Sequence, residues 1–244
     1  MTWADMPWVG FDLETTGVEP EVDRIVTAAV VSYDGGRPAR VQAWVSDAGG
    51  VEIPPGATAI HGYTTEAARE AGRPAAEVVA EVTAALAEAC EAGRPLVVMN
   101  AAFDLTMIET EADRYGLRSL FGSSVPCVLD PKVLDKQVDR YRRGKRRLED
   151  LCAHWAVPHG SAHDAVADAV AACAVTTAIL DEHPELKGLP LDELHERQAR
   201  WYADQQEGLR GYFESTPHKR HLAASVRTDW PIVPARPGFG GLGS

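Results

Sequence analysis

The stretch Trp8-Val9-Gly10-Phe11-Asp12-Leu13-Glu14-Thr15-Thr16-Gly17 places two acidic residues at the end of an apolar segment. Residues 8–13 predict a short β-strand, and residues 14–17 predict the polar turn that ends it. Because alternate side chains of a strand share one face, the carboxylates of Asp12 and Glu14 can enter one pocket. Two such charges raise each other's pKa unless a cation neutralises them. On its own, the pair also fits an exposed strand end with solvated carboxylates.

The segments that follow predict a sheet covered by helices. Apolar runs predict further strands at residues 25–33, 39–45, 96–99 and 125–129, with a hairpin turn at Asp34-Gly35-Gly36. Helical periodicity marks residues 75–92, 102–116, 147–156 and 162–182. This order predicts an α/β fold with a mixed five-stranded sheet, in which the first three strands are antiparallel and helices flank the sheet.

The 244 residues divide into three parts by composition. Residues 1–183 are predicted to form the α/β domain. Residues 184–214 follow as a helical extension, with one charged amphipathic helix over 191–213. Residues 215–244 contain four prolines and a glycine-rich end, a composition typical of a flexible tail.

Composition excludes several classes of protein. Hydrophobic residues make up 45% of the chain and charged residues 25%, which is typical of a globular protein and not of a disordered or collagen-like one. No apolar run approaches the roughly 20 residues of a membrane span, and residues 1–7 lack the features of a signal peptide. The four cysteines form no C-x-x-C pair, so neither a zinc site nor a disulfide framework is expected. We therefore expect a cytoplasmic protein with no membrane partner.

The formal net charge of −12 argues against binding of nucleic acid through a generally basic surface. The argument is weak where acidic side chains converge on metal ions, because the ions reverse the local field. Asn100-Ala101-Ala102-Phe103-Asp104 supplies another acid, since it follows the strand at 96–99 and places Asp104 in the first turn of the next helix. There the carboxylate can serve equally well as a helix cap.

A further acidic segment is His163-Asp164-Ala165-Val166-Ala167-Asp168. Ser161 and Asp164 have the spacing of a capping box, which predicts a helix start near Ala162. Residues five apart on a helix differ by roughly 140° in direction, so His163 and Asp168 cannot share a face of regular helix. His163 can therefore reach a pocket with Asp168 only if it lies at the frayed start of the helix.

These residue types point to metal-dependent chemistry on phosphodiesters. Carboxylate oxygens suit Mg²⁺ or Mn²⁺, and two such ions about 3.5–4 Å apart can stabilise both the attacking and the leaving oxygen. Four carboxylates are about what two ions require. A histidine, with an unperturbed pKa near 6.5, can accept the proton of the attacking water. An unrelated metal phosphoesterase remains an alternative.

Three motifs resemble those of the DEDDh 3′→5′ exonucleases, a family that includes the proofreading epsilon subunit of bacterial DNA polymerase III, ribonuclease T and oligoribonuclease. They are F-D-L-E-T-T-G at 11–17, N-A-A-F-D at 100–104 and H-D-A-V-A-D at 163–168. The resemblance covers roughly residues 6–182 and implies a ribonuclease H-like fold. It also implies His163 as the general base and two divalent cations, Mg²⁺ or Mn²⁺, held by Asp12, Glu14, Asp104 and Asp168.

Weaker matches to the family imply contacts with the substrate. Ile60-His61-Gly62-Tyr63-Thr64 resembles a segment beside the 3′-terminal nucleotide, with Tyr63 in place of an aliphatic residue. The family pattern also implies contacts from Thr15, Thr16 and Asn100. Phe103 occupies an aromatic position of the family, where its ring can stack on a base or anchor the helix in the core.

Seven basic residues gather at 136–147 in an otherwise acidic chain. They resemble a basic stretch of the same family, and they predict that Arg142, Arg143 and Arg146 guide a polyanion toward the metal ions. A solvated helix-and-loop surface is the alternative.

The helix at 191–213 carries Gln206-x-x-Leu209-x-x-Tyr212-Phe213, which resembles a sliding-clamp peptide. Packing of its apolar residues on the domain is the preferred interpretation. The favoured function is a proofreading-like 3′→5′ exonuclease that acts on single-stranded or frayed DNA ends and releases nucleoside 5′-monophosphates, with DNA polymerase or the clamp as a further partner. An RNA exonuclease of the same family is the main alternative. A noncatalytic polymerase-associated module is disfavoured, because all five family positions are filled.

Overall fold

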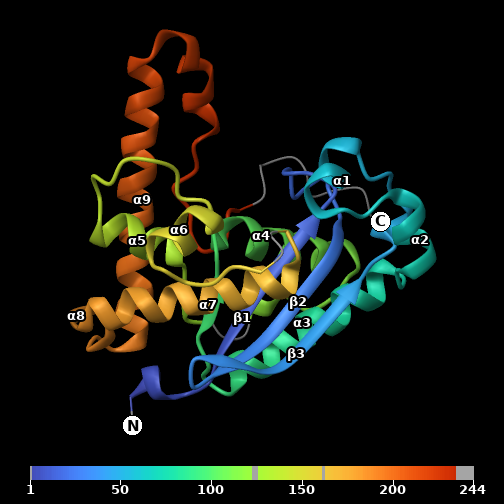
Figure 1. Ribbon diagram of the computed structural model, residues 1–244. Coiled ribbons are helices and arrows are strands. Elements are labelled where there is room, and N and C mark those ends of the chain that lie inside the picture. The colour runs from blue at the N-terminus through green and yellow to red at the C-terminus, as the bar shows by residue number, and fades with distance from the viewer. Residues whose placement is uncertain (1, 123–125, 161–162, 235–244) are drawn as a thin grey trace.

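A mixed β-sheet forms the centre of the computed structural model, which describes residues 2–122, 126–160 and 163–234 (Figure 1). Its strands lie in the order β3-β2-β1-β4-β5. β1 pairs antiparallel with β2 and β2 with β3, whereas β4 runs parallel to β1 and to β5. The predicted five-stranded mixed sheet is therefore confirmed. The strands are β1 (Trp8–Thr15), β2 (Ile25–Asp34), β3 (Arg37–Val45), β4 (Leu96–Val98) and β5 (Val128–Leu129).

Helices cover both faces of the sheet, and the alternation along β1 assigns each face. Phe11 is buried in a cluster with α3 (Ala75–Glu91) and α4 (Ala101–Arg114). Trp8 packs in a second cluster with α7 (Ala165–Glu182), α5 (Pro131–Val138) and α6 (Leu148–His154). Because successive side chains alternate between faces, Asp12 and Glu14 project toward the face that α7 covers.

Gly10 allows α7 to approach β1 closely. A Cβ atom at this position would lie 2.8 Å from the carbonyl oxygen of Ala169 and 2.9 Å from Sγ of Cys173. The alanine-rich sequence of α7 keeps the facing side chains small. As a result, the first turns of α7 lie beside the carboxyl end of β1, where the acidic residues are.

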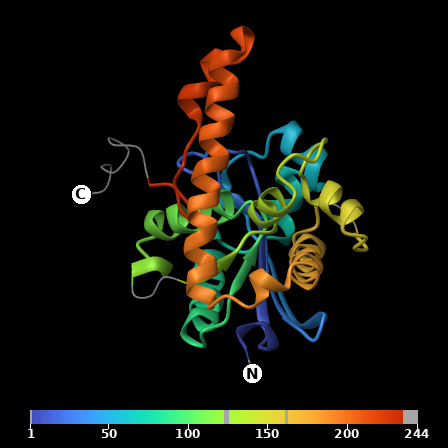
Figure 2. The ribbon, with the colours of Figure 1, turned by 90° about the vertical axis from the view of Figure 1, so that its left-hand side faces the viewer.

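Shorter elements surround this core, and the C-terminal part projects from it. The sequence continues after α7 through α8 (Pro184–Lys187) into α9 (Leu191–Ser215), and η4 (Pro217–Ser225) packs back along α9. The two form a hairpin that extends well beyond the sheet (Figures 1 and 2). Within the described ranges, no helix has the length and apolar character of a membrane span. The remaining elements are η1 (Trp3–Asp5), η2 (Ala48–Gly50), α1 (Pro55–His61), α2 (Thr65–Ala71) and η3 (Leu120–Gly122).

Residues 217–234 differ from the flexible tail that their composition predicts. Trp230 is 9% exposed and belongs to the core cluster of α3 and α4. The Val233 N–H donates to Thr106 Oγ1 at 2.9 Å, and Arg210 Nη2 donates to the Val226 carbonyl at 3.0 Å. Prolines end regular structure without preventing packing, so the interspersed apolar residues anchor this segment. Residues 235–244, the rest of the predicted tail, lie outside the described residues.

Candidate active site

The acidic cluster begins at the carboxyl end of β1. Asp12 pairs with Ala29 and Glu14 with Thr27 of β2, and the register shifts directly after Glu14. The pairing of β1 with the parallel strand β4 extends to Phe11, one residue before Asp12. Asp12 and Glu14 therefore lie at the edge where parallel strands end, which is where α/β proteins commonly place their sites.

The first turn of α4 brings a third carboxylate to this edge, as the sequence predicts. Asn100 has a left-handed backbone with φ of 62°, and Asp130 accepts hydrogen bonds from the N–H groups of Asn100 and Ala101 at 3.1 and 3.0 Å. This cap from another segment starts α4 directly after β4. Asp104 Oδ1 then accepts the Leu13 N–H at 3.0 Å, so α4 is tied to β1 between Asp12 and Glu14.

The start of α7 differs from the prediction. The helix begins at Ala165 and not near Ala162, because Asp164 is itself the N-cap and accepts the N–H groups of Val166 and Ala167 at 3.0 and 3.1 Å. Its short carboxylate accepts hydrogen bonds from two backbone donors of the first turn, so the helix begins directly after Asp164, which the sequence analysis places inside the helix as a capping-box acid. The predicted cap Ser161 and residue 162 lie outside the described residues. His163 precedes the helix with a positive φ of 64° and is not bound by helical geometry.

Glu14, His163 and Asp168 meet in one cluster. Each offers a potential ligand atom, and these atoms lie within 4.8 Å of one another. Asp168 is buried and His163 is exposed, so the cluster opens to solvent on the side of the histidine. A carboxylate pair with an imidazole at this spacing can hold a divalent cation.

Asp168 is oriented by two histidines, of which the sequence analysis identified one. The backbone N–H of His163 donates to Asp168 Oδ2 at 3.2 Å. His159 Nε2 lies 2.8 Å from Asp168 Oδ1, and the His159 side chain is 14% exposed. A histidine four residues before the motif histidine was the available signal, but this spacing alone is not diagnostic.

Burial and mutual repulsion raise the pKa values of the neighbouring carboxyl groups. Burial is the main cause for Asp12, followed by the charges of Asp104, Asp168 and Glu14. Burial also raises the pKa of Asp104, despite the hydrogen bond from Leu13. Burial, with the charges of Asp168 and Asp164, raises the pKa of Glu14 to about 7. Clustered acids of this kind favour the binding of hard divalent cations, which relieve the repulsion. The oxygen-rich donor set therefore fits Mg²⁺ or Mn²⁺.

A cavity adjoins the cluster, and one residue predicted to contact substrate, His61, lines it. His61 and His163 both line this cavity of about 490 Å³, together with Trp44 and Tyr63. His61 Nε2 is buried without a hydrogen-bond partner among the described atoms. Burial lowers the pKa of His61, and the nearby His163 lowers it further, against the effect of the Thr15 backbone. The structure thus brings His61 to the same side of the molecule as the acidic cluster.

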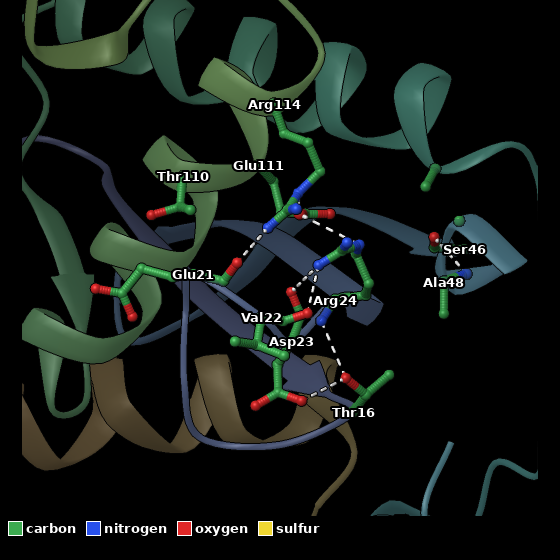
Figure 3. A network of polar contacts seen from close by, with 12 residues as sticks. Thr16, Glu21, Val22, Asp23, Arg24, Ser46, Ala48, Thr110, Glu111 and Arg114 are labelled. Carbon is green, nitrogen blue, oxygen red and sulfur yellow. Dashed lines mark hydrogen bonds and ion pairs between the residues drawn. The ribbon is translucent and has the colours of Figure 1, made fainter. Parts of the chain in front are cut away.

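A polar network fixes the turn that follows β1 (Figure 3). The Thr16 hydroxyl donates to Asp23 Oδ1 at 2.9 Å and accepts the Arg24 N–H at 3.0 Å. Arg114 donates to the buried carboxylate of Glu111 at 2.6 Å and to the carbonyl of Glu21 at 3.1 Å. The Thr15 hydroxyl also donates within the turn, to the Gly17 carbonyl at 2.7 Å, and substrate contacts from Thr15 and Thr16 stay a prediction.

Asn100 and Phe103 lie at the start of α4. Asn100 Oδ1 accepts a hydrogen bond from Lys132 Nζ at 2.8 Å. Phe103 is partly buried against the core cluster, and both residues line a cavity of about 340 Å³ between α4 and α9. The ring therefore anchors the helix in the core and also borders a cavity, while its stacking on a base stays a prediction.

Two of the three predicted basic contacts are turned inward. Asp135 on α5 is 0% exposed, and its Oδ2 accepts hydrogen bonds from Arg146 and from Arg142 Nη2, the latter at 2.7 Å. Trp155 Nε1 donates to Asp135 Oδ1 at 2.8 Å. Arg143 is exposed. The sequence pattern could not show this arrangement, because it does not tell which acid of α5 is buried beneath the basic loop.

Comparison with known proteins assigns the chain to a family. The model of the exonuclease family RNase T matches residues 9–176, which include all five acidic and histidine positions described above. The chain belongs to this exonuclease family. A search of curated protein sequences gives no match.

Solved structures of exonuclease I share the fold, which confirms a ribonuclease H-like architecture. The zinc-bound complex of E. coli exonuclease I with single-stranded DNA aligns with a TM-score of 0.62 and 21% identity, over 74% of this chain and 41% of that one. Exonuclease I from Methylocaldum szegediense aligns with a TM-score of 0.62 and 21% identity, over 81% and 45%. The E. coli enzyme with a dT13 oligonucleotide gives 0.56 and 21%, over 88% and 45%. The chain thus spans less than half of the length of these exonucleases.

Proposed function

We propose that this exonuclease uses divalent cations to remove nucleotides from the 3′ ends of single-stranded nucleic acid, with DNA as the favoured substrate. The observation that carries the proposal is the convergence of Glu14, His163 and Asp168 within 4.8 Å. The charges of Asp104, Asp168 and Glu14 add to burial in raising the pKa of Asp12, and the charge of Glu14 adds to that of Asp104, so both carboxylates lie near the cluster. Membership of the exonuclease family supports a hydrolytic reaction at a strand end.

In this scheme, the acidic side chains bind divalent cations and fix their positions. Asp12 and Glu14 come from β1, Asp168 from α7 and Asp104 from α4, and the charges of the other three add to burial in raising the pKa of Asp12. When bound, two divalent cations supply the positive charge that stabilises the attacking and leaving oxygens of the phosphodiester. The hydrogen bonds to Leu13 and His159 hold Asp104 and Asp168 in fixed directions, which reduces the reorganisation needed for binding.

His163 is the proposed general base. It stands on the solvent side of the cluster, just before α7, where an incoming water has access. Its imidazole can accept the proton of that water, and the product is then a nucleoside 5′-monophosphate. Because His163 precedes the helix, its ring can approach the cluster from the solvent side. Asp168 approaches from the first turn of α7.

Similar solved structures are the reason to propose single-stranded DNA as the favoured substrate. The exonuclease I complexes contain single-stranded DNA or oligonucleotides such as dT13. A proofreading role and association with a DNA polymerase or sliding clamp remain predictions from the sequence resemblance. RNA is the alternative substrate, and the digestion experiment described next distinguishes DNA from RNA.

The test is digestion of matched DNA and RNA strands that carry a label at the 5′ end. With Mg²⁺ or Mn²⁺, wild-type protein should shorten the DNA strand stepwise and release nucleoside 5′-monophosphates, and EDTA should stop the reaction. Asp12→Asn should abolish the ladder, whereas the matched control Asp34→Asn alters an exposed hairpin carboxylate and should leave it intact. Immediate release of the labelled 5′ nucleotide, or equal activity of Asp12→Asn, would contradict the proposal. Preferential shortening of RNA would assign the RNA alternative.

A further inference from the structure

The hairpin of α9 and η4 forms one wall of a cavity beside the acidic cluster. The cavity has a volume of about 340 Å³ and lies between the turn at 18–21, α4, α9 and residues 225–233. The hairpin is held in place from both ends, through the Arg210–Val226 and Val233–Thr106 hydrogen bonds. The turn on the opposite wall is fixed by the network around Thr16 and Arg114 (Figure 3). Both walls are therefore built before any ligand arrives.

Alongside polar residues, the cavity is lined by aromatic and aliphatic side chains. They are Phe103 from α4, Tyr202, Leu209 and Phe213 from α9, and Val226 from the returning segment. Asn100, Gln206 and Arg227 add a few polar groups. Flat apolar ligands with polar edges fit such a site, because the rings can stack on them while the polar groups reach their edges.

The cavity and the proposed active site share the first turn of α4. Asn100 and Phe103 line it, and Asp104 follows directly in the chain with its carboxylate on the Leu13 N–H. A strand whose 3′ end lies at the acidic cluster therefore has this cavity within reach of its next nucleotides. The carboxylate of Glu21 lines the cavity, and the cation of Arg227 pairs with Asp229 at 3.3 Å, so the lining offers little attraction for a phosphate and leaves a base as the fitting part of the strand.

We propose that this cavity binds an unpaired nucleobase of the strand upstream of the terminal nucleotide. The inference rests on the proposed function and extends it to the C-terminal hairpin, which lies outside residues 9–176 matched by the family model. It also accounts for the Gln206, Leu209 and Phe213 pattern. These three residues line the cavity, whereas Tyr212 of the same pattern is 49% exposed and does not.

The test measures base stacking directly in the full-length protein. An oligodeoxynucleotide with 2-aminopurine at successive positions from its 3′ end is titrated with protein in EDTA. Fluorescence should be quenched at one internal position, and Phe213→Leu, which keeps an apolar side chain but removes the ring, should abolish that quenching. Phe213→Leu should also weaken binding by about 5- to 100-fold. Tyr212→Ala removes the neighbouring exposed ring and should change neither quantity.

Steady-state kinetics provide a second readout. The KM advantage of a long strand over a dinucleotide should shrink for Phe213→Leu and persist for Tyr212→Ala, and thermal unfolding should confirm that both variants are folded. Quenching and KM ratios that match those of wild type in Phe213→Leu would overturn the pocket while leaving the exonuclease proposal intact. Absence of hydrolysis of every strand by wild-type protein would instead refute the proposed function. A dimer that Phe213→Leu dissociates would show that a second copy of the chain occupies the cavity, which also overturns the inference.

Discussion

His159 Nε2 lies 2.8 Å from Asp168 Oδ1, while the backbone N–H of His163 binds the other oxygen of the same carboxylate at 3.2 Å. Both contacts come from residues that precede α7, and they fix the direction in which Asp168 faces Glu14. Partners of this kind orient a metal-binding carboxylate and reduce the conformational freedom lost on binding. His159 is therefore a positioning residue in the proposed site.

The variant His159→Asn should weaken the binding of Mn²⁺ by roughly 10- to 100-fold, because Asp168 loses one of its orienting contacts. Titration followed by the paramagnetic signal of Mn²⁺ measures this affinity without any turnover. Excess metal should restore activity if His159 acts through Asp168. The exposed His218→Asn on η4 is the matched control and should bind Mn²⁺ as wild type does. Unchanged Mn²⁺ affinity in His159→Asn would remove the positioning role.

The metal-free protein should lose stability as the pH rises from about 5 to about 8. The pKa values of Asp12 and Asp104 are raised, and that of Glu14 is about 7, so the folded state holds protons that the unfolded chain has released. Stability that depends on these protons is present below the unfolded pKa values and is lost as the pH rises through the folded ones. Thermal unfolding in EDTA should show a fall of roughly 5 °C over this range.

Two comparisons isolate the carboxylates in that experiment. Excess Mg²⁺ should raise the unfolding temperature more at about pH 8 than at about pH 5.5, because protons compete with the cation. Asp12→Asn should give a shallower slope in EDTA, since one repelling charge is gone. The buried His61 and His195 have lowered pKa values and act in the opposite direction, but they are shared by both proteins. A rising unfolding temperature that Asp12→Asn does not alter would contradict the electrostatic account.

Substitutions in the basic loop should distinguish arginines that stabilise the fold from arginines that are merely exposed. Arg146→Ala should lower the free energy of unfolding by roughly 3 kcal/mol, because the fully buried Asp135 carboxylate loses a partner. Arg143→Ala should change it by less than about 0.5 kcal/mol, since Arg143 is exposed. Urea denaturation measures both. Equal effects of the two substitutions would mean that Arg146 does not support the fold through Asp135.

The salt dependence of the Michaelis constant then tests guidance of the substrate by Arg143. Removal of one arginine that contacts a phosphate should reduce the slope by about one unit. The exposed Arg140→Ala serves as a control for a change of charge alone. A slope that falls equally in both variants would indicate a general effect of charge and not a contact made by Arg143.

Local patterns in the sequence predicted most of the sheet and the chain positions that meet at the site. Alternation along β1 correctly placed Asp12 and Glu14 on one face, and the end of β4 correctly placed Asp104 in the first turn of α4. These predictions succeeded because strand and helix periodicity involve neighbours in the chain. The site also depends on distant pairs, such as Asp130 with the start of α4, and nothing in the local pattern specifies them.

The failures of prediction share this cause. The composition of residues 217–234 resembles a tail, yet Trp230 reaches a core built from α3 and α4. The basic loop resembles a solvent-facing surface, yet Arg142 and Arg146 are paired with Asp135. His159 belongs to no recognised motif. Its role arises from its contact with Asp168 in the folded chain. In each case a tertiary contact decided between alternatives that were equivalent along the chain.

Gly10→Ala should disturb the site from a distance by separating α7 from β1. The new Cβ would lie 2.8 Å from the Ala169 carbonyl and 2.9 Å from Cys173 Sγ, so the helix must shift. Overpacking of this kind costs roughly 1–3 kcal/mol. Because Asp168 precedes Ala169 on α7, Mn²⁺ affinity should fall together with the stability. Gly56→Ala on α1 is the control, since its Cβ would meet no atom within 4 Å and alanine favours a helix. Gly10→Ala protein that keeps both its unfolding free energy and its Mn²⁺ affinity would show that the close approach of α7 does not set the position of Asp168.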